Sequence, residues 1–166
     1  MATKGNLLHL ELAHLEPLIP HVTEFSGCCK DTIKKLATMG VLQVSTVFEQ
    51  ALADKMGLTV ISEDEADLSD GSDAKLSSVR TSSLGRLYSA PVTGLHNKTG
   101  DLCVQVYERK QNNFFYFRIP NEAYCHIPKT SNIEIPFFED GTPKRENRSK
   151  VNWWNYEVPS LEDLCR

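Results

Sequence analysis

The chain has 166 residues, of which 40% are hydrophobic and 24% charged, and its formal net charge at pH 7 is −4. This composition is typical of a globular protein that can bury a core without disulfide staples, and no apolar run is long enough to predict a membrane span. The first residues include Glu11 and Glu16 and lack the apolar core of a signal peptide. We therefore expect one domain over residues 1–166, in the cytoplasm and not in a membrane.

The N-terminal third is predicted to be helical. Residues 7–18 and 31–40 have helical apolar spacing and end at a proline and a glycine, respectively. A third helix is predicted over residues 45–57, because Thr46 and Glu49 have the spacing of a capping box. The leucine face of the first helix is the surface that we expect to form a homodimer.

From residue 58 onward the apolar period changes from helical to strand-like, which divides the chain into a helical portion (1–57) and a β-rich portion (58–166). The predicted strands are 58–62, 75–81, 101–108, 114–119 and 133–138, with the third and fourth joined as a hairpin and the last at a sheet edge. Residues 141–159 are predicted to be loop. Helices followed by mostly antiparallel strands predict an α/β (α+β) fold with a mixed β-sheet.

The stretch around Asp70-Gly71 is acidic and carries a strong signal for a hairpin turn. With a three-residue turn that begins at Asp70, Asp67 lies opposite Lys75, and Asp73 shares that face because it is two residues from Lys75. A two-residue turn would separate the carboxylates. The three-residue register therefore predicts that Asp67, Asp73 and Lys75 converge.

Two carboxylates and an ammonium group on one face suit chemistry on phosphate. Asp67 and Asp73 can hold Mg²⁺, with Mn²⁺ as a substitute, while waters and a phosphate oxygen complete the coordination. Lys75 can orient or deprotonate the attacking water, or stabilise the negative charge that develops. Without a cation the carboxylates would repel a phosphodiester, and this repulsion is the reason to expect a metal. The alternative is a solvated acidic turn with an exposed lysine.

These residues resemble the PD-(D/E)XK nuclease superfamily, with Asp67 as the first acid and Asp73-Ala74-Lys75 in the (D/E)XK position. The stretch DAKLSSVRTSSLGRLYSAPV is similar to the corresponding part of the mismatch-repair nicking endonuclease, and the overall layout resembles small type II restriction endonucleases. The resemblance covers roughly residues 41–120. It implies a restriction-endonuclease-like sheet, Mg²⁺-dependent hydrolysis of DNA, and a supporting catalytic role for Glu49 on the preceding helix.

Other acids compete for the same roles. Asp64 is a rival for the first carboxylate, and Asp70 is a weaker one. Glu108-Arg109-Lys110 is a second (D/E)XK-like string, with Asp101 as its first acid. We rank it second, because two carboxylates seven residues apart on one strand face opposite sides of the sheet.

Charge is distributed unevenly along the chain. Residues 1–73 contain 5 Lys/Arg and 12 Asp/Glu, whereas residues 74–154 contain 12 Lys/Arg and 7 Asp/Glu. The basic residues expected to contact nucleic acid are Arg80, Arg86, Lys144, Arg145 and Arg148, with Lys98, Arg118 and Lys150 as further candidates. Trp153 and Trp154 could stack on bases, but we expect them to anchor the C-terminus in the core.

The five cysteines are odd in number and form no Cys-x-x-Cys pair, so we expect free thiols and no structural zinc. Together the patterns predict a Mg²⁺-dependent DNA endonuclease of a sequence-specific restriction or homing type. It would act on double-stranded DNA as a homodimer with one site per strand. The rival is a non-catalytic DNA-binding or interaction module that uses the basic C-terminal patch. A third hypothesis is metal-dependent hydrolysis of a small phosphoester.

Overall fold

A computed structural model describes residues 44–166, except 62, 82–84, 86 and 147–149. The helices predicted over 7–18 and 31–40 lie outside the described residues, so the helical N-terminal third and its leucine face stay predictions. The chain divides into two compact units, Met1–Val60 and Ile61–Arg166. The assignment of all residues to one domain also stays a prediction.

Helix α5 (Val44–Met56) is the described element of the first unit and confirms the third predicted helix. The helix ends because Gly57 adopts a φ of 68°, a left-handed conformation that costs glycine little. The backbone N–H of Leu58 then donates to the carbonyl of Ala53 over 2.8 Å, the hydrogen bond of a Schellman cap. No helix in the described part of the chain combines the length and the apolar character needed to cross a bilayer.

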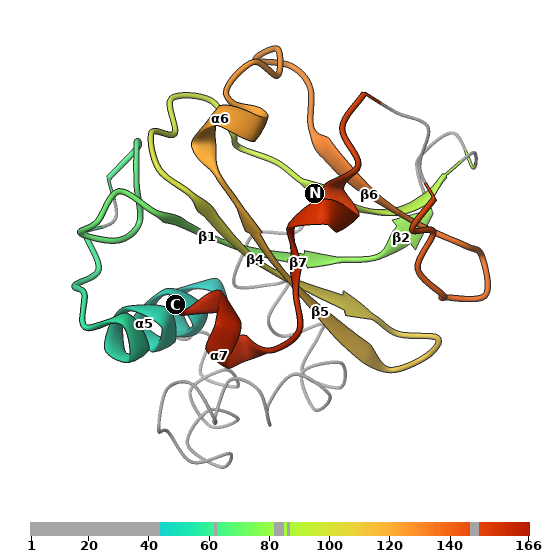
Figure 1. Cartoon of the computed structure of the whole chain (residues 1–166), viewed down its shortest axis with the longest axis horizontal. Coiled ribbons are helices and arrows are strands. Elements are labelled where there is room, and N and C mark those ends of the chain that lie inside the picture. Colours follow the sequence, from blue (N-terminus) through green and yellow to red (C-terminus); the bar gives the residue numbers. More distant parts are fainter. Residues whose placement is uncertain (1–43, 62, 82–84, 86, 147–149) are drawn as a thin grey trace. The chain divides into compact units, whose positions relative to one another are not determined.

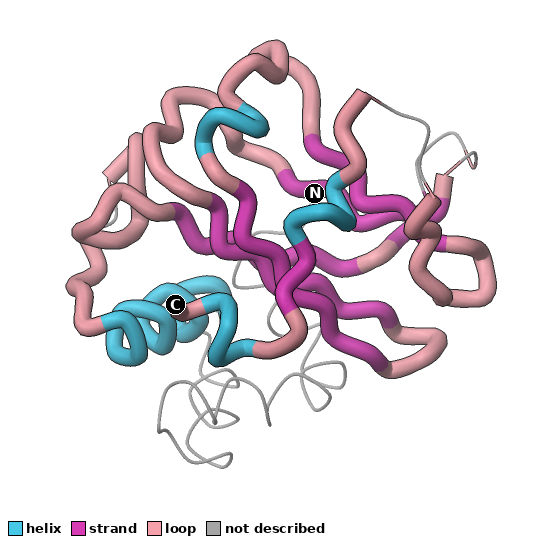
Figure 2. The backbone as a smooth tube through the Cα atoms, viewed as in Figure 1, coloured by secondary structure: helices cyan, strands magenta, loops and turns pink. Residues whose placement is uncertain are grey.

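The second unit is built on two β-sheets, drawn as arrows in Figure 1 and in magenta in Figure 2. Its strands are β1 (Asp73–Ser78), β2 (Arg80–Thr81), β3 (Tyr88–Val92), β4 (Leu102–Glu108), β5 (Asn113–Ile119), β6 (Ile133–Phe137) and β7 (Glu157–Val158). One sheet has the order β1-β4-β5-β7 and the other β2-β3-β6. Strands β1 and β4 are parallel, while β4–β5 and β5–β7 are antiparallel, so the first sheet is mixed. This confirms the prediction of a mixed sheet in an α/β fold.

Three short helices complete this unit, α6 (Asn121–Tyr124), a 3₁₀ helix η1 (Trp153–Tyr156) and α7 (Leu161–Leu164). Helix α6 follows β5 directly, and η1 leads into β7. The C-terminal stretch predicted as loop therefore contains the 3₁₀ helix and a strand. Asn152 starts η1 by accepting a hydrogen bond from the backbone N–H of Trp154, 3.1 Å away.

The chain passes from the first sheet into the second directly after β1. After β1, the N–H of Val79 still donates to the carbonyl of Tyr107 over 2.9 Å, and the next residue, Arg80, pairs with Ser89 of β3. Residues from both sheets therefore share one hydrophobic core. Trp153 and Trp154 belong to this core and are only 8% and 7% exposed, which confirms that they anchor the C-terminal stretch.

The strand predictions succeed where alternation and a short loop coincide. The hairpin of β4 and β5 and the edge strand β6 are confirmed. No strand forms over the described residues of 58–62, where Ile61 makes one backbone hydrogen bond, to the carbonyl of Asp67 at 2.8 Å. Strand β3 and helix α6 were not expected.

The predicted acidic hairpin is wrong. The partner of β1 is β4, with Asp73 aligned to Leu102, and not a strand that precedes the turn. The backbone N–H groups of both Asp67 and Leu68 donate to the carbonyl of Ser72, at 3.1 and 3.0 Å. These bonds close a compact turn, so there is no antiparallel ladder to place Asp67 opposite Lys75.

Several chain segments meet at one end of the first sheet. Because β1 and β4 are parallel and β5 is antiparallel to β4, β1 and β4 begin where β5 ends. The turn over residues 67–72, the β3–β4 loop over residues 93–101, and helix α6 all lie at this end (Figure 1). This arrangement positions the candidate site.

Candidate active site

Asp73, the first residue of β1, is a buried carboxylate at the centre of the cluster. Its exposed fraction is 1%, and its two oxygens lie 2.9 Å from the Nζ atoms of Lys75 and Lys98. The angles of these contacts are not those of hydrogen bonds, and neither oxygen has another hydrogen-bond partner in the described part of the chain. Asp73 is therefore held by electrostatic attraction between two ammonium groups, one at each oxygen.

Asp67 reaches the same place from the turn before β1. One of its carboxylate oxygens, Oδ2, accepts a hydrogen bond from the backbone N–H of Ala74 at 2.9 Å. Burial, and next the neighbouring Asp73 carboxylate, raise the pKa of Asp67 above its usual value of 3.8, while the bond from Ala74 and the charge of Lys98 act in the opposite direction. The two carboxylates thus interact closely enough to compete for a proton.

Lys75 shares the cluster because it is two residues after Asp73 on the same strand, where side chains return to the same face. Its side chain is 21% exposed. Lys75 therefore combines contact with the buried carboxylate and access to solvent. The structure brings Asp67, Asp73 and Lys75 together, although not through the hairpin that predicted their meeting.

Lys98 is a fourth member whose position the sequence did not indicate. Its Nζ contacts Asp73 and also donates to the backbone carbonyl of Asp64 over 2.7 Å. The Lys98 side chain is 11% exposed and is therefore more buried than the side chain of Lys75. The sequence places Lys98 only among the further candidates for phosphate contacts, because the pairing that brings residue 98 to residue 73 depends on the parallel alignment of β1 and β4.

Two glycines allow the β3–β4 loop to pass this close. A Cβ on Gly100 would lie 2.1 Å from the carbonyl oxygen of Gly71, so the two segments touch through their backbones. Gly94 has a φ of 68°, and a Cβ there would lie 3.3 Å from Nζ of Lys75. These positions explain why glycines flank the lysine that reaches Asp73.

The rival first acids have other places. Asp70 accepts hydrogen bonds from both the N–H (2.9 Å) and the hydroxyl (2.5 Å) of Ser72, so it stabilises the turn. Asp64 has an exposed side chain, and its backbone carbonyl is the group that Lys98 binds. Asp67 is the acid whose side chain interacts with Asp73.

The second (D/E)XK-like string is part of a structural turn. Glu108 is fully buried and accepts hydrogen bonds from the hydroxyl of Tyr88 (2.6 Å) and the N–H groups of Lys110 (2.9 Å) and Gln111 (2.7 Å). Asp101 lies beyond the other end of β4 and is paired with Arg118 at 3.1 Å. These two acids do not form a shared site.

The remaining predicted residues are dispersed. Glu49 lies on α5, in the first compact unit, and its participation stays a prediction. Arg86 and Arg148 lie outside the described residues. Arg80 is exposed on β2, and Lys144 is exposed with its Nζ 5.8 Å from the centre of the Phe138 ring.

Arg145 is engaged within the chain. Its guanidinium lies 4.7 Å from the centre of the Trp154 ring and is paired with the carboxylate of Glu157. Because both contacts hold the guanidinium within the chain, Arg145 is less available to bind DNA as part of the basic C-terminal patch. Burial of the Trp154 ring also removes it as a stacking platform for a base.

The cluster fits a divalent cation that needs few protein ligands. No group of three or more histidine, cysteine or acidic side chains that could hold a metal occurs among the described residues. Mg²⁺ is commonly bound through only one or two carboxylates, with waters and substrate oxygens completing its shell. Asp67 and Asp73 supply two neighbouring carboxylates.

No protein-family model, curated protein or solved structure matches this chain. What the cluster does must therefore be inferred from its own residues.

Proposed function

We propose that this chain is a Mg²⁺-dependent DNA endonuclease that hydrolyses phosphodiester bonds at the cluster of Asp67, Asp73 and Lys75. The main support is Asp73, a buried carboxylate that lies beside the carboxylate of Asp67 and 2.9 Å from each of two ammonium groups. A buried charge is costly unless it is paired. Asp73 has that pairing in Lys75 and Lys98, and Asp67 adds a second carboxylate beside it, which gives the two carboxylates that Mg²⁺ commonly takes from a protein.

Asp67 and Asp73 would hold the Mg²⁺ ion, and Mn²⁺ could replace it because both ions prefer oxygen ligands. A bound ion of this kind supplies positive charge near the phosphate and lowers the pKa of a coordinated water. Lys75, next to Asp73 and partly exposed, would donate hydrogen bonds to the attacking water or to a phosphate oxygen. Lys98 would act as a positioning residue that keeps Asp73 and the Asp64 backbone in place.

DNA as the substrate is supported by the charge of the chain after residue 73, where Lys and Arg outnumber Asp and Glu. The mixed sheet with Asp73 and Lys75 on one face is in keeping with a restriction-endonuclease-like type. A single cluster cuts one strand, so double-strand cleavage of a restriction or homing type would require a homodimer. Exposed Arg80 and Lys144 are candidates for phosphate contacts.

The direct test is cleavage of plasmid and phage DNA in Mg²⁺ and in EDTA, by the wild type and by Lys75→Ala. We expect discrete Mg²⁺-dependent products from the wild type and none from Lys75→Ala, with DNA affinity nearly unchanged. Lys110→Ala is the matched control, because Lys110 ends the other (D/E)XK-like string but caps a surface turn near Glu108. It should cleave like the wild type.

The opposite result is equally informative. If the folded wild type cuts no DNA with Mg²⁺ or Mn²⁺ but binds duplex DNA tightly in EDTA, the chain is a binding module and not a nuclease. Loss of that binding in Lys144→Ala would then assign it to the basic C-terminal patch. Hydrolysis of mononucleotides without cleavage of DNA would support the small-phosphoester hypothesis.

A further inference from the structure

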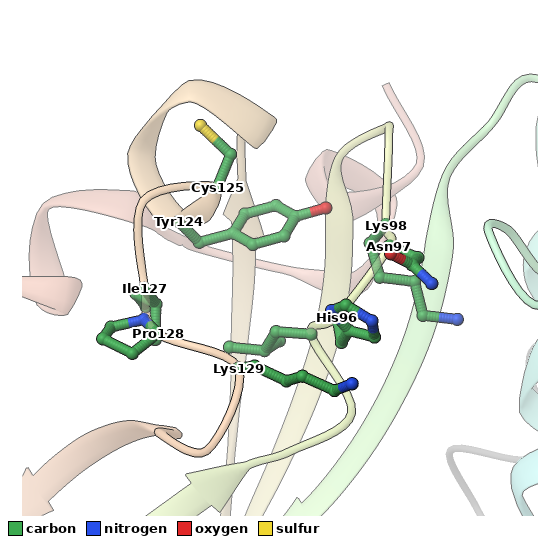
Figure 3. A pocket seen from close by; sticks show the side chains of 9 residues that line it. His96, Asn97, Lys98, Tyr124, Cys125, Ile127, Pro128 and Lys129 are labelled. Atoms are coloured by element: carbon green, nitrogen blue, oxygen red, sulfur yellow. The ribbon is translucent and has the colours of Figure 1, made fainter.

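A pocket of about 300 Å³ is lined in part by the β3–β4 loop, the loop that also carries Lys98 to Asp73. One wall is the loop segment Leu95–Lys98, and the opposite wall is the segment Tyr124–Lys129 that follows β5. Figure 3 shows Lys98 extending away from this space toward the ribbon of β1, where it meets Asp73. The same short loop thus borders both the pocket and the cluster.

The lining of the pocket is mostly polar, with basic groups and a smaller apolar part. Leu95, Ile127 and Pro128 supply apolar surface, and the Tyr124 ring is fixed by a hydrogen bond from its hydroxyl to the carbonyl of Gly100 at 2.5 Å. His96 and Lys129 are both exposed on the rim, and Figure 3 shows them on the same side of the pocket.

This combination matches a nucleotide unit, whose base and sugar have apolar faces and whose phosphate is an anion. The volume, about 300 Å³, is at the lower end of the range of about 300–1,000 Å³ for small-molecule sites. It therefore suits a single nucleotide and not a longer segment. Lys129 can bind a phosphate as a point charge, and the imidazole of His96 can hydrogen-bond to it.

The pocket is also near enough to the cluster to belong to the same substrate. Burial, and to a smaller extent the charge of Asp73, raise the pKa of Tyr124, while a hydrogen bond with Asn121 lowers it. The Asp73 carboxylate therefore acts electrostatically on the pocket wall. Lys98 physically connects them, since it lines the pocket and contacts Asp73. A DNA strand lying across the loop would place one nucleotide on each side of it.

We propose that the pocket between residues 95–98 and 124–129 is a subsite for the nucleotide adjacent to the cleaved phosphate, with Lys129 and His96 binding its own phosphate. This subsite rests on the proposed nuclease function for its biological role. Its binding chemistry can be measured without cleavage, so the two proposals can fail separately.

The experiment is a titration with deoxythymidine monophosphate in EDTA, followed by calorimetry and by the NMR shifts of the backbone amides. Inorganic phosphate and thymidine are titrated in parallel. We expect saturable binding of the nucleotide, stronger than that of phosphate or thymidine alone. Lys129→Ala and His96→Ala should each weaken it by about tenfold, the effect of losing one charge-assisted hydrogen bond. Both side chains are exposed, so both variants should keep the fold.

Lys110→Ala serves as the control for loss of a surface cation and should bind the nucleotide like the wild type. Absence of nucleotide binding, or binding that Lys129→Ala and His96→Ala leave unchanged, would overturn the subsite whether or not the plasmid is cut. Equal affinity for inorganic phosphate, or for thymidine, would also overturn it, because the pocket would then recognise only half of the nucleotide. Nucleotide binding that responds to the pocket variants, in a protein that cuts no DNA, would support the subsite and refute the nuclease.

Discussion

Replacing Asp73 by asparagine should both destabilise the protein and abolish Mg²⁺ binding. The substitution keeps the shape of the side chain but removes the negative charge that faces two ammonium groups, each 2.9 Å from a carboxylate oxygen. Lys75 and Lys98 would then share only the carboxylate of Asp67. Because Asp73 is almost fully buried, water cannot replace its charge.

The size of the effect follows from these distances. At an effective dielectric constant of about 20, an ion pair at this separation attracts by about 6 kcal/mol. Desolvation of the buried carboxylate offsets several kcal/mol of this attraction, and breaking a buried pair by removing one partner costs about 3–5 kcal/mol in measured cases. The two ammonium groups are 21% and 11% exposed, so we expect the lower end, about 3 kcal/mol. For a chain of this length that corresponds to a fall in Tm of roughly 10 °C.

Asp67→Asn is the matched comparison, because it removes a carboxylate from the same cluster. The amide oxygen can still accept from the N–H of Ala74, and the repulsion with Asp73 disappears, so the Tm at pH 7 should be unchanged or higher. Thermal melts of the three proteins, with and without Mg²⁺, measure both effects, since a ligand that binds the folded state raises Tm. A Tm for Asp73→Asn equal to that of the wild type, or an equal loss in Asp67→Asn, would refute the assignment of Asp73 as the charge centre.

Three further outcomes follow from the same structure. Burial and the neighbouring Asp73 carboxylate raise the pKa of Asp67 in the folded protein, so protonation of Asp67 stabilises the fold. This stabilisation is fully present below the unfolded-state pKa of about 3.8. It is lost as the pH rises through the higher folded-state pKa. Melts across the acid range should show this fall, and Asp67→Asn should not. The Gly100→Ala substitution would place a Cβ 2.1 Å from the Gly71 carbonyl oxygen. It should lower the free energy of unfolding by about 1–3 kcal/mol and weaken Mg²⁺ binding measured by calorimetry. The control substitution at the preceding residue, Thr99→Ala, should have neither effect. Glu108→Gln should lower the free energy of unfolding, measured by urea denaturation, by about 1.5–3 kcal/mol, and should leave kcat of the folded protein unchanged. A loss of kcat would restore the second (D/E)XK-like string as a candidate site.

Local patterns were enough for the elements that depend on local contacts. The β4–β5 hairpin joins strands separated by four residues, so alternation and a polar loop predict it directly. The same rule failed at Asp70-Gly71, where a good turn signal was taken to imply two paired strands. The turn exists, but its hydrogen bonds converge on the carbonyl of Ser72, and β1 finds its partner about thirty residues later. Parallel pairing has no short-range signature.

The candidate site was predictable in part for a reason that does not depend on pairing. Asp73 and Lys75 share a face in any strand, because side chains alternate with a period of two. Asp67 joins them through a side-chain hydrogen bond to Ala74, which no strand register describes. Lys98 could not be identified, because its approach to Asp73 requires both the β1–β4 alignment and the backbone contact at Gly100.

The β3–β4 loop over residues 93–101 therefore carries more of the proposed function than its sequence suggests. Its glycines let it approach Lys75 and the Gly71 turn, and Lys98 connects it to the buried carboxylate. The same loop forms one wall of the pocket. A change that displaces the loop backbone should then disturb the carboxylate cluster and the pocket together, whereas a change at Lys129 on the opposite wall should disturb the pocket alone. That difference separates a substrate site with two coupled halves from two unrelated features that happen to share one end of a sheet.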